Sequence, residues 1–390
     1  MSVFWLALAA FAIGTEGFVI AGLLPAIAAD LSISVSAAGQ LVTAYALTYA
    51  VGSPILAVAL NNIDRRTVLA LALTTFIAGN LAAMVASSYA LLLASRMLMA
   101  LGSGLCMPTA LAVSVAVAAP ERRGRAVALV TSGLTVATVI GVPLGNLVGS
   151  LLGWRATFAM VALIGAVALA GLLLGLPRGL PRNTASLGER LAVARHGNVL
   201  VALLITILWG LGGFTVFTYF AVPAARPRLR CLADQPCAAG VRRRRRDREH
   251  ARRRPGRPAR HTRHRSARAR RHGDRADPAF AGPHKLMPGQ AHYAVLGTIF
   301  LWGISGWAFY PAQIASIIRI EPQASMIALS LNASSMYLGF AIGGALGGAV
   351  LATLSPNDLG WIGGTSVAAS LLVHLARGWQ ARPKPVKIAG

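Results

Sequence analysis

The chain has 390 residues, of which 55% are hydrophobic and 13% charged, whereas soluble domains average about 25% charged residues. This composition excludes an ordinary soluble domain and indicates a protein embedded in a membrane. The formal net charge of +25 suggests nucleic-acid binding only until it is mapped, because residues 224–285 hold 20 Arg and one Lys against five acids. The three cysteines, Cys106, Cys231 and Cys237, lack the spacing of a metal site or a disulfide framework.

The first apolar run, residues 3–24, carries a single carboxylate, Glu16, near its middle. About 20 apolar residues cross the ~30 Å hydrocarbon core of a bilayer, so the run predicts an uncleaved transmembrane helix. An ionisable side chain at that depth costs about 2.5–3.5 kcal/mol on insertion scales and normally faces a partner or a water-filled path. Glu16 is therefore a candidate functional residue, with a structural ion pair as the alternative.

Nine further apolar runs follow, so the sequence predicts an all-α polytopic membrane protein with ten recognisable spans. They lie at residues 37–60, 67–86, 90–118, 126–152, 154–176, 199–222, 292–318, 324–354 and 359–376. Outside the basic stretch, the Lys and Arg residues of the loops all fall on one side of the membrane if the N-terminus is cytoplasmic, with Arg155 as the exception. The positive-inside rule then predicts that both termini are cytoplasmic.

Residues 224–290 interrupt the spans with a stretch rich in Arg, Pro, Ala, Gly and His that has no helical periodicity. One hypothesis is a disordered basic loop that binds anionic lipid or nucleic acid. The other is a GC-rich coding sequence translated out of frame between two compensating indels. The preserved length and the abrupt loss and return of hydrophobicity favour the frame shift.

Two offsets along the chain agree on an internal duplication. Pro108 and Pro311 are 203 residues apart, and the Gly-rich segments 140–145 and 342–347 are 202 residues apart. Related halves are typical of transporters. Adding the same offset to residues 37–86 gives a region almost wholly inside the basic stretch, so two helices are predicted to be missing there.

Five motifs carry a family resemblance. They are Gly14-Thr15-Glu16-Gly17-Phe18, Asp64-Arg65-Arg66, Arg96-x5-Gly102-x-Gly104, Gly141-Val142-Pro143-Leu144-Gly145 and Gly153-Trp154-Arg155-x-x-Phe158. With them the sequence resembles the major facilitator superfamily, in particular its bacterial twelve-helix drug:proton antiporter branch. The first motif resembles members that export purines, nucleosides, sugars or chloramphenicol. Ser36-x-x-Gly39-Gln40-Leu41 and Pro311-Ala312-Gln313 make bacterial purine efflux proteins the nearest likeness.

The resemblance implies the major-facilitator fold of two six-helix halves, with helices 8 and 9 replaced by the basic non-helical stretch. The implied parts are an N-terminal half at residues 1–176, a cytoplasmic linker at 177–198, a C-terminal half at 199–376 that contains the anomalous segment 224–290, and a cytoplasmic tail at 377–390.

Three groups of residues are candidates for the site. Glu16 and Arg96 are expected to pair, because they lie ~12 Å and ~9 Å below the outer surface at 1.5 Å per residue and a buried charge is tolerated mainly when paired. The resemblance implies gating by Asp64, Arg65 and Arg66 and a helix-five antiporter role for Gly141, Pro143 and Gly145; the alternatives are a positive-inside turn and plain helix packing. A substrate cavity is expected at Asn146, Trp209, Phe217, Trp302, Tyr310 and Gln313, with aromatic packing as the alternative.

The sequence thus predicts a proton-coupled efflux transporter of drugs, purines or nucleosides, or sugars, in which Glu16 binds the proton and Arg96 favours its charged form. The expected partners are a small-molecule substrate, protons and the lipid bilayer, and the expected state is a monomer in the bacterial inner membrane. No enzymatic activity, metal, cofactor or nucleic-acid partner is expected. The alternative is an inactive or non-transporting membrane protein whose basic loop binds anionic partners.

Overall fold

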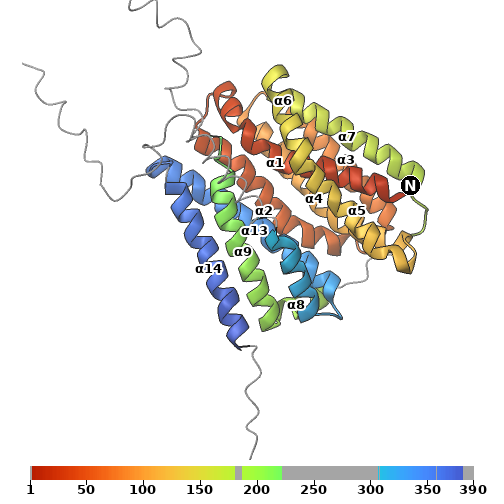
Figure 1. Cartoon of the computed structure of the whole chain (residues 1–390). Coiled ribbons are helices and arrows are strands. Elements are labelled where there is room, and N and C mark those ends of the chain that lie inside the picture. The colour runs from red at the N-terminus through yellow and green to blue at the C-terminus, as the bar shows by residue number, and fades with distance from the viewer. Residues whose placement is uncertain (1, 181–186, 222–305, 307, 357, 381–390) are drawn as a thin grey trace, which may run out of the picture. The chain divides into compact units, whose positions relative to one another are not determined.

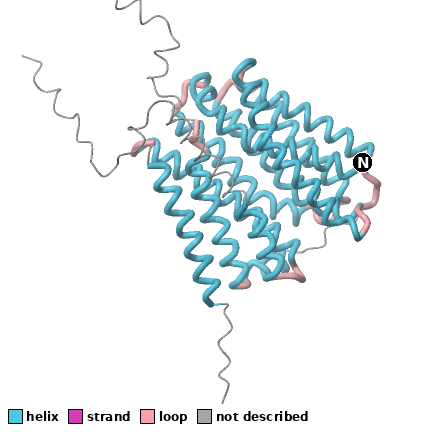
Figure 2. The backbone as a smooth tube through the Cα atoms, viewed as in Figure 1, coloured by secondary structure: helices cyan, strands magenta, loops and turns pink. Residues whose placement is uncertain are grey.

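The computed structural model of the chain describes residues 2–180, 187–221, 306, 308–356 and 358–380. Within these ranges the chain is helical and contains no strand (Figure 2). Residues 308–320 are also helical, although no helix label is given to them. The named helices are α1 (Ser2–Asp30), α2 (Val35–Ala59), α3 (Arg65–Met84), α4 (Tyr89–Val117), the short η1 (Pro120–Arg122), α5 (Arg123–Val136), the π-helical η2 (Ala137–Gly141), α6 (Val142–Leu152), α7 (Trp154–Gly175), α8 (Leu187–Arg195), α9 (Gly197–Phe217), α13 (Ser325–Thr353) and α14 (Asp358–Gln380) (Figure 1).

Nine membrane-crossing segments are found among the described residues, each long and apolar enough to span a bilayer. They match nine of the ten predicted spans, and this part of the prediction is confirmed. The tenth predicted span, residues 292–318, and the basic stretch at 224–290 lie wholly or largely outside the described residues. Whether helices 8 and 9 are missing therefore stays a prediction.

The end of α1 differs from the predicted limit at residue 24. The helix continues through Pro25 to Asp30, because Ile27 and Ala28 are buried and tertiary packing outweighs the single hydrogen bond that a proline removes. It stops at Ser32, which has a φ of 53°, where the N–H of residue 33 donates to the carbonyl of Ala28 at 3.0 Å. This is the Schellman arrangement, in which a left-handed residue reverses the chain and satisfies the last carbonyls.

Polar side chains begin the next three helices. Ser34, Asp64 and Ser88 are the N-caps of α2, α3 and α4, and each accepts a backbone N–H from two or three residues further on. An N-cap satisfies amides that the helix itself cannot. The short helix α8 lies within residues 177–198, the segment predicted as a linker.

Helix packing joins segments that are far apart in sequence. Helix α1 packs on α5 and α7, α3 packs on α4 and α7, and α9 packs on α13 and α14, while α2 packs on both α4 and α13. The contacts divide the chain into a larger unit, Met1–Ala225 with Pro311–Gly390, and a second unit, Arg226–Tyr310. All the named helices belong to the larger unit, and α2 with α13 is its main junction between the N-terminal and C-terminal parts.

The contact between α9 and α13 depends on a close backbone approach. A Cβ atom at Gly343 would collide with the carbonyl oxygen of Leu211, and one at Gly339 would collide with that of Ile207. Small residues let membrane helices come this near, where van der Waals contact is the main attraction between them.

Candidate functional site

A buried ion pair lies at the centre of the N-terminal helices. The Arg96 Nη1 atom of α4 contacts the Glu16 Oε1 atom of α1, and both side chains are 0% exposed. The guanidinium also lies 4.4 Å from the ring centre of Tyr45, which comes from α2. A cation over an aromatic face is stabilised by the ring quadrupole, so three helices meet at one charge pair.

The helix-five motif lies beside this pair. A Cβ atom at Gly141 would collide with the Thr15 hydroxyl, and one at Gly145 would lie 2.7 Å from Val19 Cγ2, so both glycines pack on α1 next to Glu16. The motif begins where η2 ends, and the N–H of residue 142 donates to the carbonyl of Ala137, which is the wide π-type turn. Such turns inside α-helices are often found at functional sites. Pro143, whose ring has no N–H, follows directly.

Aromatic side chains connect the ion pair to the C-terminal helices. Tyr49 of α2 stacks on Tyr337 of α13 with ring centres 3.6 Å apart, and Phe340 of α13 stacks on Phe214 of α9 at 3.5 Å. Phe18, two residues after Glu16, lies 6.2 Å from Phe214. The result is a continuous aromatic wall across the junction of the two parts of the chain.

Three of the six residues predicted for a substrate cavity have contacts that show their surroundings. Phe217 and Trp209 belong to the aromatic wall, at 5.9 Å from Phe18 and 6.4 Å from Phe340 respectively. Gln313 is buried and donates to the Ala202 carbonyl at 2.7 Å and to the Thr206 hydroxyl at 3.0 Å, so its amide is engaged in helix packing.

The other three predicted cavity residues are Asn146, Trp302 and Tyr310, and their surroundings say less about a cavity. Asn146 packs against Gly22 of α1, since a Cβ atom at Gly22 would collide with the Asn146 amide. Trp302 lies outside the described residues, and Tyr310 belongs to the second unit. Their role in binding substrate stays a prediction.

The loop motif after α2 has mainly structural contacts. Asp64 accepts the N–H of Arg66 at 3.2 Å as the N-cap of α3, and the Arg66 Nη2 atom donates to the carbonyl of Leu173 on α7. Arg65 instead lines a pocket of about 280 Å³ between the ends of α2, α3 and α4 and the start of α13. Of the predicted cavity residues that the structure describes, none lines this pocket.

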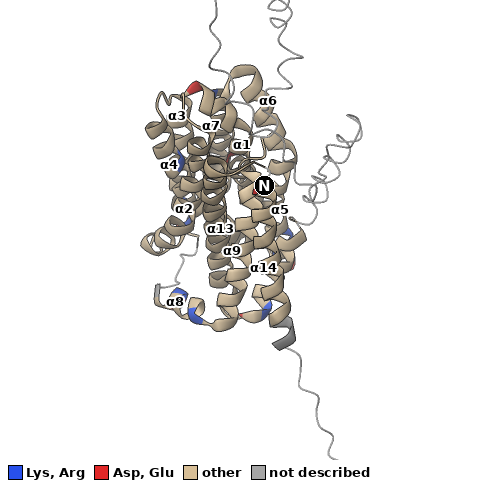
Figure 3. Cartoon of the chain, turned by 90° about the vertical axis from the view of Figure 1, so that its left-hand side faces the viewer, with Lys and Arg blue, Asp and Glu red and all other residues tan. Residues whose placement is uncertain are grey.

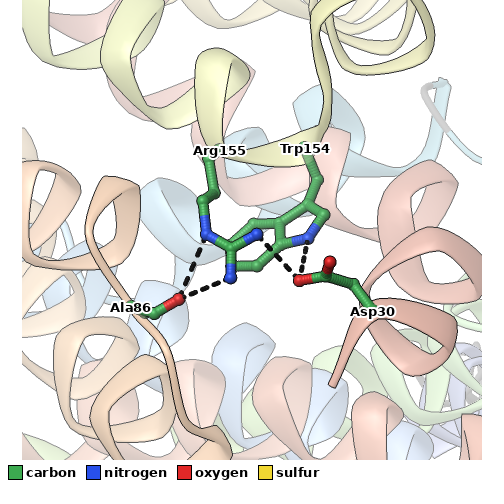
Figure 4. A network of polar contacts seen from close by, with 4 residues as sticks. All are labelled: Asp30, Ala86, Trp154 and Arg155. Atoms are coloured by element: carbon green, nitrogen blue, oxygen red, sulfur yellow. Dashed lines mark hydrogen bonds and ion pairs between the residues drawn. The ribbon is translucent and has the colours of Figure 1, made fainter. Parts of the chain in front are cut away.

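A second ion pair joins three helix ends at the opposite side of the N-terminal helices. Arg155 Nη1 donates to Asp30 Oδ2 at 2.7 Å, and Trp154 Nε1 donates to the same oxygen at 3.2 Å (Figure 4). The Nε and Nη2 atoms of Arg155 donate to the carbonyl of Ala86 at 3.1 and 2.8 Å. Asp30 ends α1, Ala86 follows α3 and Arg155 is the second residue of α7, so one guanidinium fastens three helices together.

Sequence reasoning missed Tyr45, Tyr49, Tyr337 and Phe340. Tyr45 and Tyr49 are four residues apart on α2, and Tyr337 and Phe340 are three apart on α13, which places each pair on one helix face. That spacing could have predicted an aromatic stripe on each helix, although it does not show that the two stripes contact each other.

Comparison with known proteins gives consistent matches. The model of the Major Facilitator Superfamily matches residues 6–226. YbcL of Bacillus subtilis is an uncharacterised transporter of the major-facilitator type. The chain is 29% identical to it over 96% of the chain and 94% of that protein. It is 28% identical to the inner membrane transport protein YdhP of Escherichia coli over 98% of the chain and 97% of that protein.

Two further matches concern part of the chain and the fold. A chloramphenicol resistance protein of Streptomyces lividans is 34% identical over 57% of the chain and 57% of its own length. The inward-open structure of the xylose transporter XylE from E. coli has a TM-score of 0.64 at 15% identity, covering 99% of the chain and 97% of that protein.

Proposed function

The chain belongs to the Major Facilitator Superfamily, and from this we propose that it is a proton-coupled efflux transporter of the bacterial inner membrane. The relatives and the fold are those of multi-pass membrane transporters of small molecules, which are not enzymes. Proton coupling, the direction of transport and the N-in and C-in orientation are the additional steps of the proposal. The substrate class is that of drugs, purines or nucleosides, or sugars; a chloramphenicol resistance protein and a probable sugar efflux transporter of Mannheimia succiniciproducens are among the relatives.

The observation that carries the proposal is the fully buried ion pair between Glu16 and Arg96. Glu16 is the only acidic residue inside the nine described spans apart from those at helix ends, so a proton entering these helices has one carboxylate to bind. Protonation would remove the charge of Glu16 and leave the Arg96 guanidinium without its anion. Because a buried unpaired charge is costly, the helices that hold the two groups would rearrange.

The contacts around the pair offer a route from this event to the substrate path. Arg96 lies over Tyr45, and Tyr45 lies 6.3 Å from Tyr337 of α13. A shift of the guanidinium is therefore transmitted to the aromatic wall at the α2 and α13 junction. Coupling of this kind needs an element with two discrete arrangements, which the proposal assigns to that junction.

The two ends of the contact between α2 and α13 differ in how closely the helices are held: one end is hydrogen-bonded and the other borders a pocket. At the predicted outer end, the Ser36 hydroxyl of α2 donates to the Gly348 carbonyl of α13 at 2.8 Å. A Cβ atom at Gly39 of α2 would collide with the Tyr219 hydroxyl, which donates to the Gly344 carbonyl of α13 at 2.9 Å. At the predicted cytoplasmic end, the pocket lined by Arg65 separates α13 from α3 and α4. The bonded outer end and the pocket at the inner end support, within this proposal, an inward-facing arrangement, which is one of the two states that alternating access requires.

The test is transport by the full chain in inverted vesicles with an imposed proton gradient, with chloramphenicol, a purine, a nucleoside and a sugar as probes. Glu16→Gln keeps the size of the side chain but cannot ionise. It is expected to abolish proton-driven uptake while exchange of substrate down its own gradient continues. Glu121→Gln, at an exposed position in η1, is the matched control and should transport at the wild-type rate.

Glu16→Gln protein that accumulates a probe at the wild-type rate under the proton gradient would show that Glu16 only holds helices together. If the wild-type protein accumulates none of the four probes, the substrate classes named here are wrong.

A further inference from the structure

The pocket at the predicted cytoplasmic end is amphipathic. It has a volume of about 280 Å³, at the lower limit of the roughly 300–1,000 Å³ typical of small-molecule sites. Most of its lining is apolar and comes from α2, the α2 C-cap Leu60 and α4, among them Ala57, Leu105, Pro108 and Ala112. The polar lining side chains are Arg65, Arg190, Ser330 and Thr109.

The described lining of the pocket contains basic but no acidic side chains. Among the described residues that line the pocket, two are arginines and none is Asp or Glu, although Asp64 directly precedes Arg65 in the chain. Arg65 is the first residue of α3, and the first turns of α13 contribute Met326, Ile327 and Ser330. The N-cap of α13, Ala324, has no side chain that could accept the free amides of that end. Helix N-termini carry partial positive charge, so the start of α13 adds to the two guanidinium charges, whereas the start of α3 is already capped by the Asp64 carboxylate.

Arg190 is the side chain that most requires a partner. It is only 6% exposed, its Nη1 atom lies 3.4 Å from the Ser330 hydroxyl, and its buried Nε atom has no hydrogen-bond partner among the described residues. Burial lowers the pKa of Arg190 from its ordinary value, because desolvation disfavours the charged form. Figure 3 shows the basic residues of α8, the helix that carries Arg190 into this position.

We propose that this pocket binds an anionic amphiphile, with a carboxylate or phosphate head between Arg65 and Arg190 and an apolar tail along α2 and α4. A planar guanidinium can donate to two oxygens of either head group, and charge-assisted bonds of this kind are about twice as strong as neutral ones. An exported acid entering from the cytoplasm and an anionic phospholipid of the inner leaflet share this chemistry. The site is separate from Glu16, so the proposal does not depend on proton coupling.

The test measures binding of radiolabelled octanoate to the purified full chain in a non-ionic detergent by equilibrium dialysis. Saturable binding at one site is expected, with competition by octyl phosphate but not by octanol or octylammonium. Arg190→Gln should weaken binding about tenfold or more, as loss of a hydrogen bond to a charged group does. Arg195→Gln, at an exposed position on the same helix, is the matched control and should leave the affinity unchanged.

Two further variants guard against misfolding. Arg190→Lys keeps the charge and should retain part of the affinity, and Ala57→Leu should weaken binding by filling the apolar side without changing any charge. Equal octanoate affinity in Arg190→Gln and Arg195→Gln would overturn the proposal, as would equal binding of octanol.

Protein in nanodiscs then distinguishes the two sources of the ligand. If phosphatidylglycerol displaces octanoate and phosphatidylcholine does not, the natural occupant is the anionic lipid. If neither lipid displaces it, the occupant is a soluble acid.

Discussion

The two ion pairs of the N-terminal helices differ mainly in their exposure to solvent. The side chains of Glu16 and Arg96 are 0% exposed, whereas those of Arg155 and Asp30 are 38% and 44% exposed. Exposed pairs are generally worth less than about 1 kcal/mol, while removing one partner of a buried pair costs about 3–5 kcal/mol because the other charge is left uncompensated. The same pairing chemistry therefore has different consequences at the two places.

The first prediction concerns the buried pair. Arg96→Gln should lower the free energy of unfolding by about 3–5 kcal/mol, and the double variant Glu16→Gln with Arg96→Gln should recover most of that loss, because neither charge remains. Unfolding of the purified variants in one detergent, followed by circular dichroism, measures this. Arg155→Gln serves as the comparison and should cost about 1–2 kcal/mol, mainly through its lost bonds to Ala86. A double variant less stable than Arg96→Gln alone would contradict the prediction.

The pairing of Glu16 with Arg96 was predictable because each is an isolated charge within an apolar run, and two such charges need each other. Tyr45 and Tyr337 were not predictable as neighbours, because an aromatic residue is compatible with lipid, protein and cavity environments alike. Arg190 is a further example. A linker arginine is normally solvated, and only the position of α8 against α13 shows that it is buried.

At the scale of the element, hydropathy located the nine described spans, but it did not locate the short helices α8 and η1, the helix ends or the irregular turns. The run at residues 126–152 was expected as one span, and the structure resolves it into α5, η2 and α6. The wide turn before Pro143 depends on which carbonyl accepts the N–H of residue 142, and the hydropathy of a segment contains no information about that choice. The extension of α1 to Asp30 depends on burial of Ile27, which is likewise a tertiary effect.

The second prediction tests the approach of α9 and α13. Gly343→Ala places a methyl group against the Leu211 carbonyl and should destabilise the protein by about 1–3 kcal/mol, the usual cost of overpacking. Gly213→Ala on α9 is the matched control, because no atom of the described part of the chain lies within 4 Å of its Cβ position. It should be neutral or stabilising by up to about 1 kcal/mol, since alanine restricts the unfolded chain more than glycine does. Apparent melting temperatures in the same detergent would decide, and equal values for the two variants would exclude a backbone contact at Gly343.

At the scale of the whole molecule, one prediction concerns the orientation of the chain in the membrane. The charge bias predicts that the loops containing Arg122 and Arg195 are cytoplasmic and that the turn containing Ser87 is outside. All three residues are exposed, so each can be replaced by cysteine and tested with a membrane-impermeant maleimide on intact cells. Ser87→Cys should react, and Arg122→Cys and Arg195→Cys should react only after the membrane is permeabilised. The reverse pattern would place both termini outside.

The second whole-molecule prediction concerns residues 224–290. The family model match ends at residue 226, two residues after this stretch begins. If the segment is translated out of frame, another frame of the same codons should encode two apolar spans of about 20 residues each. The nucleotide sequence of the region is the measurement. Alternative frames that encode no apolar span would leave the basic loop as a genuine part of the chain.

The buried ion pair also imposes an order of events during synthesis. Glu16 leaves the ribosome 80 residues ahead of Arg96, and at about 5–20 residues per second this interval lasts roughly 4–16 s. Throughout it, α1 must enter the bilayer with an acid that has no counterion yet. The remaining residues of α1 therefore have to outweigh the cost of that acid unaided, and the length and hydropathy of the first span meet a requirement of biogenesis that the finished transporter no longer has.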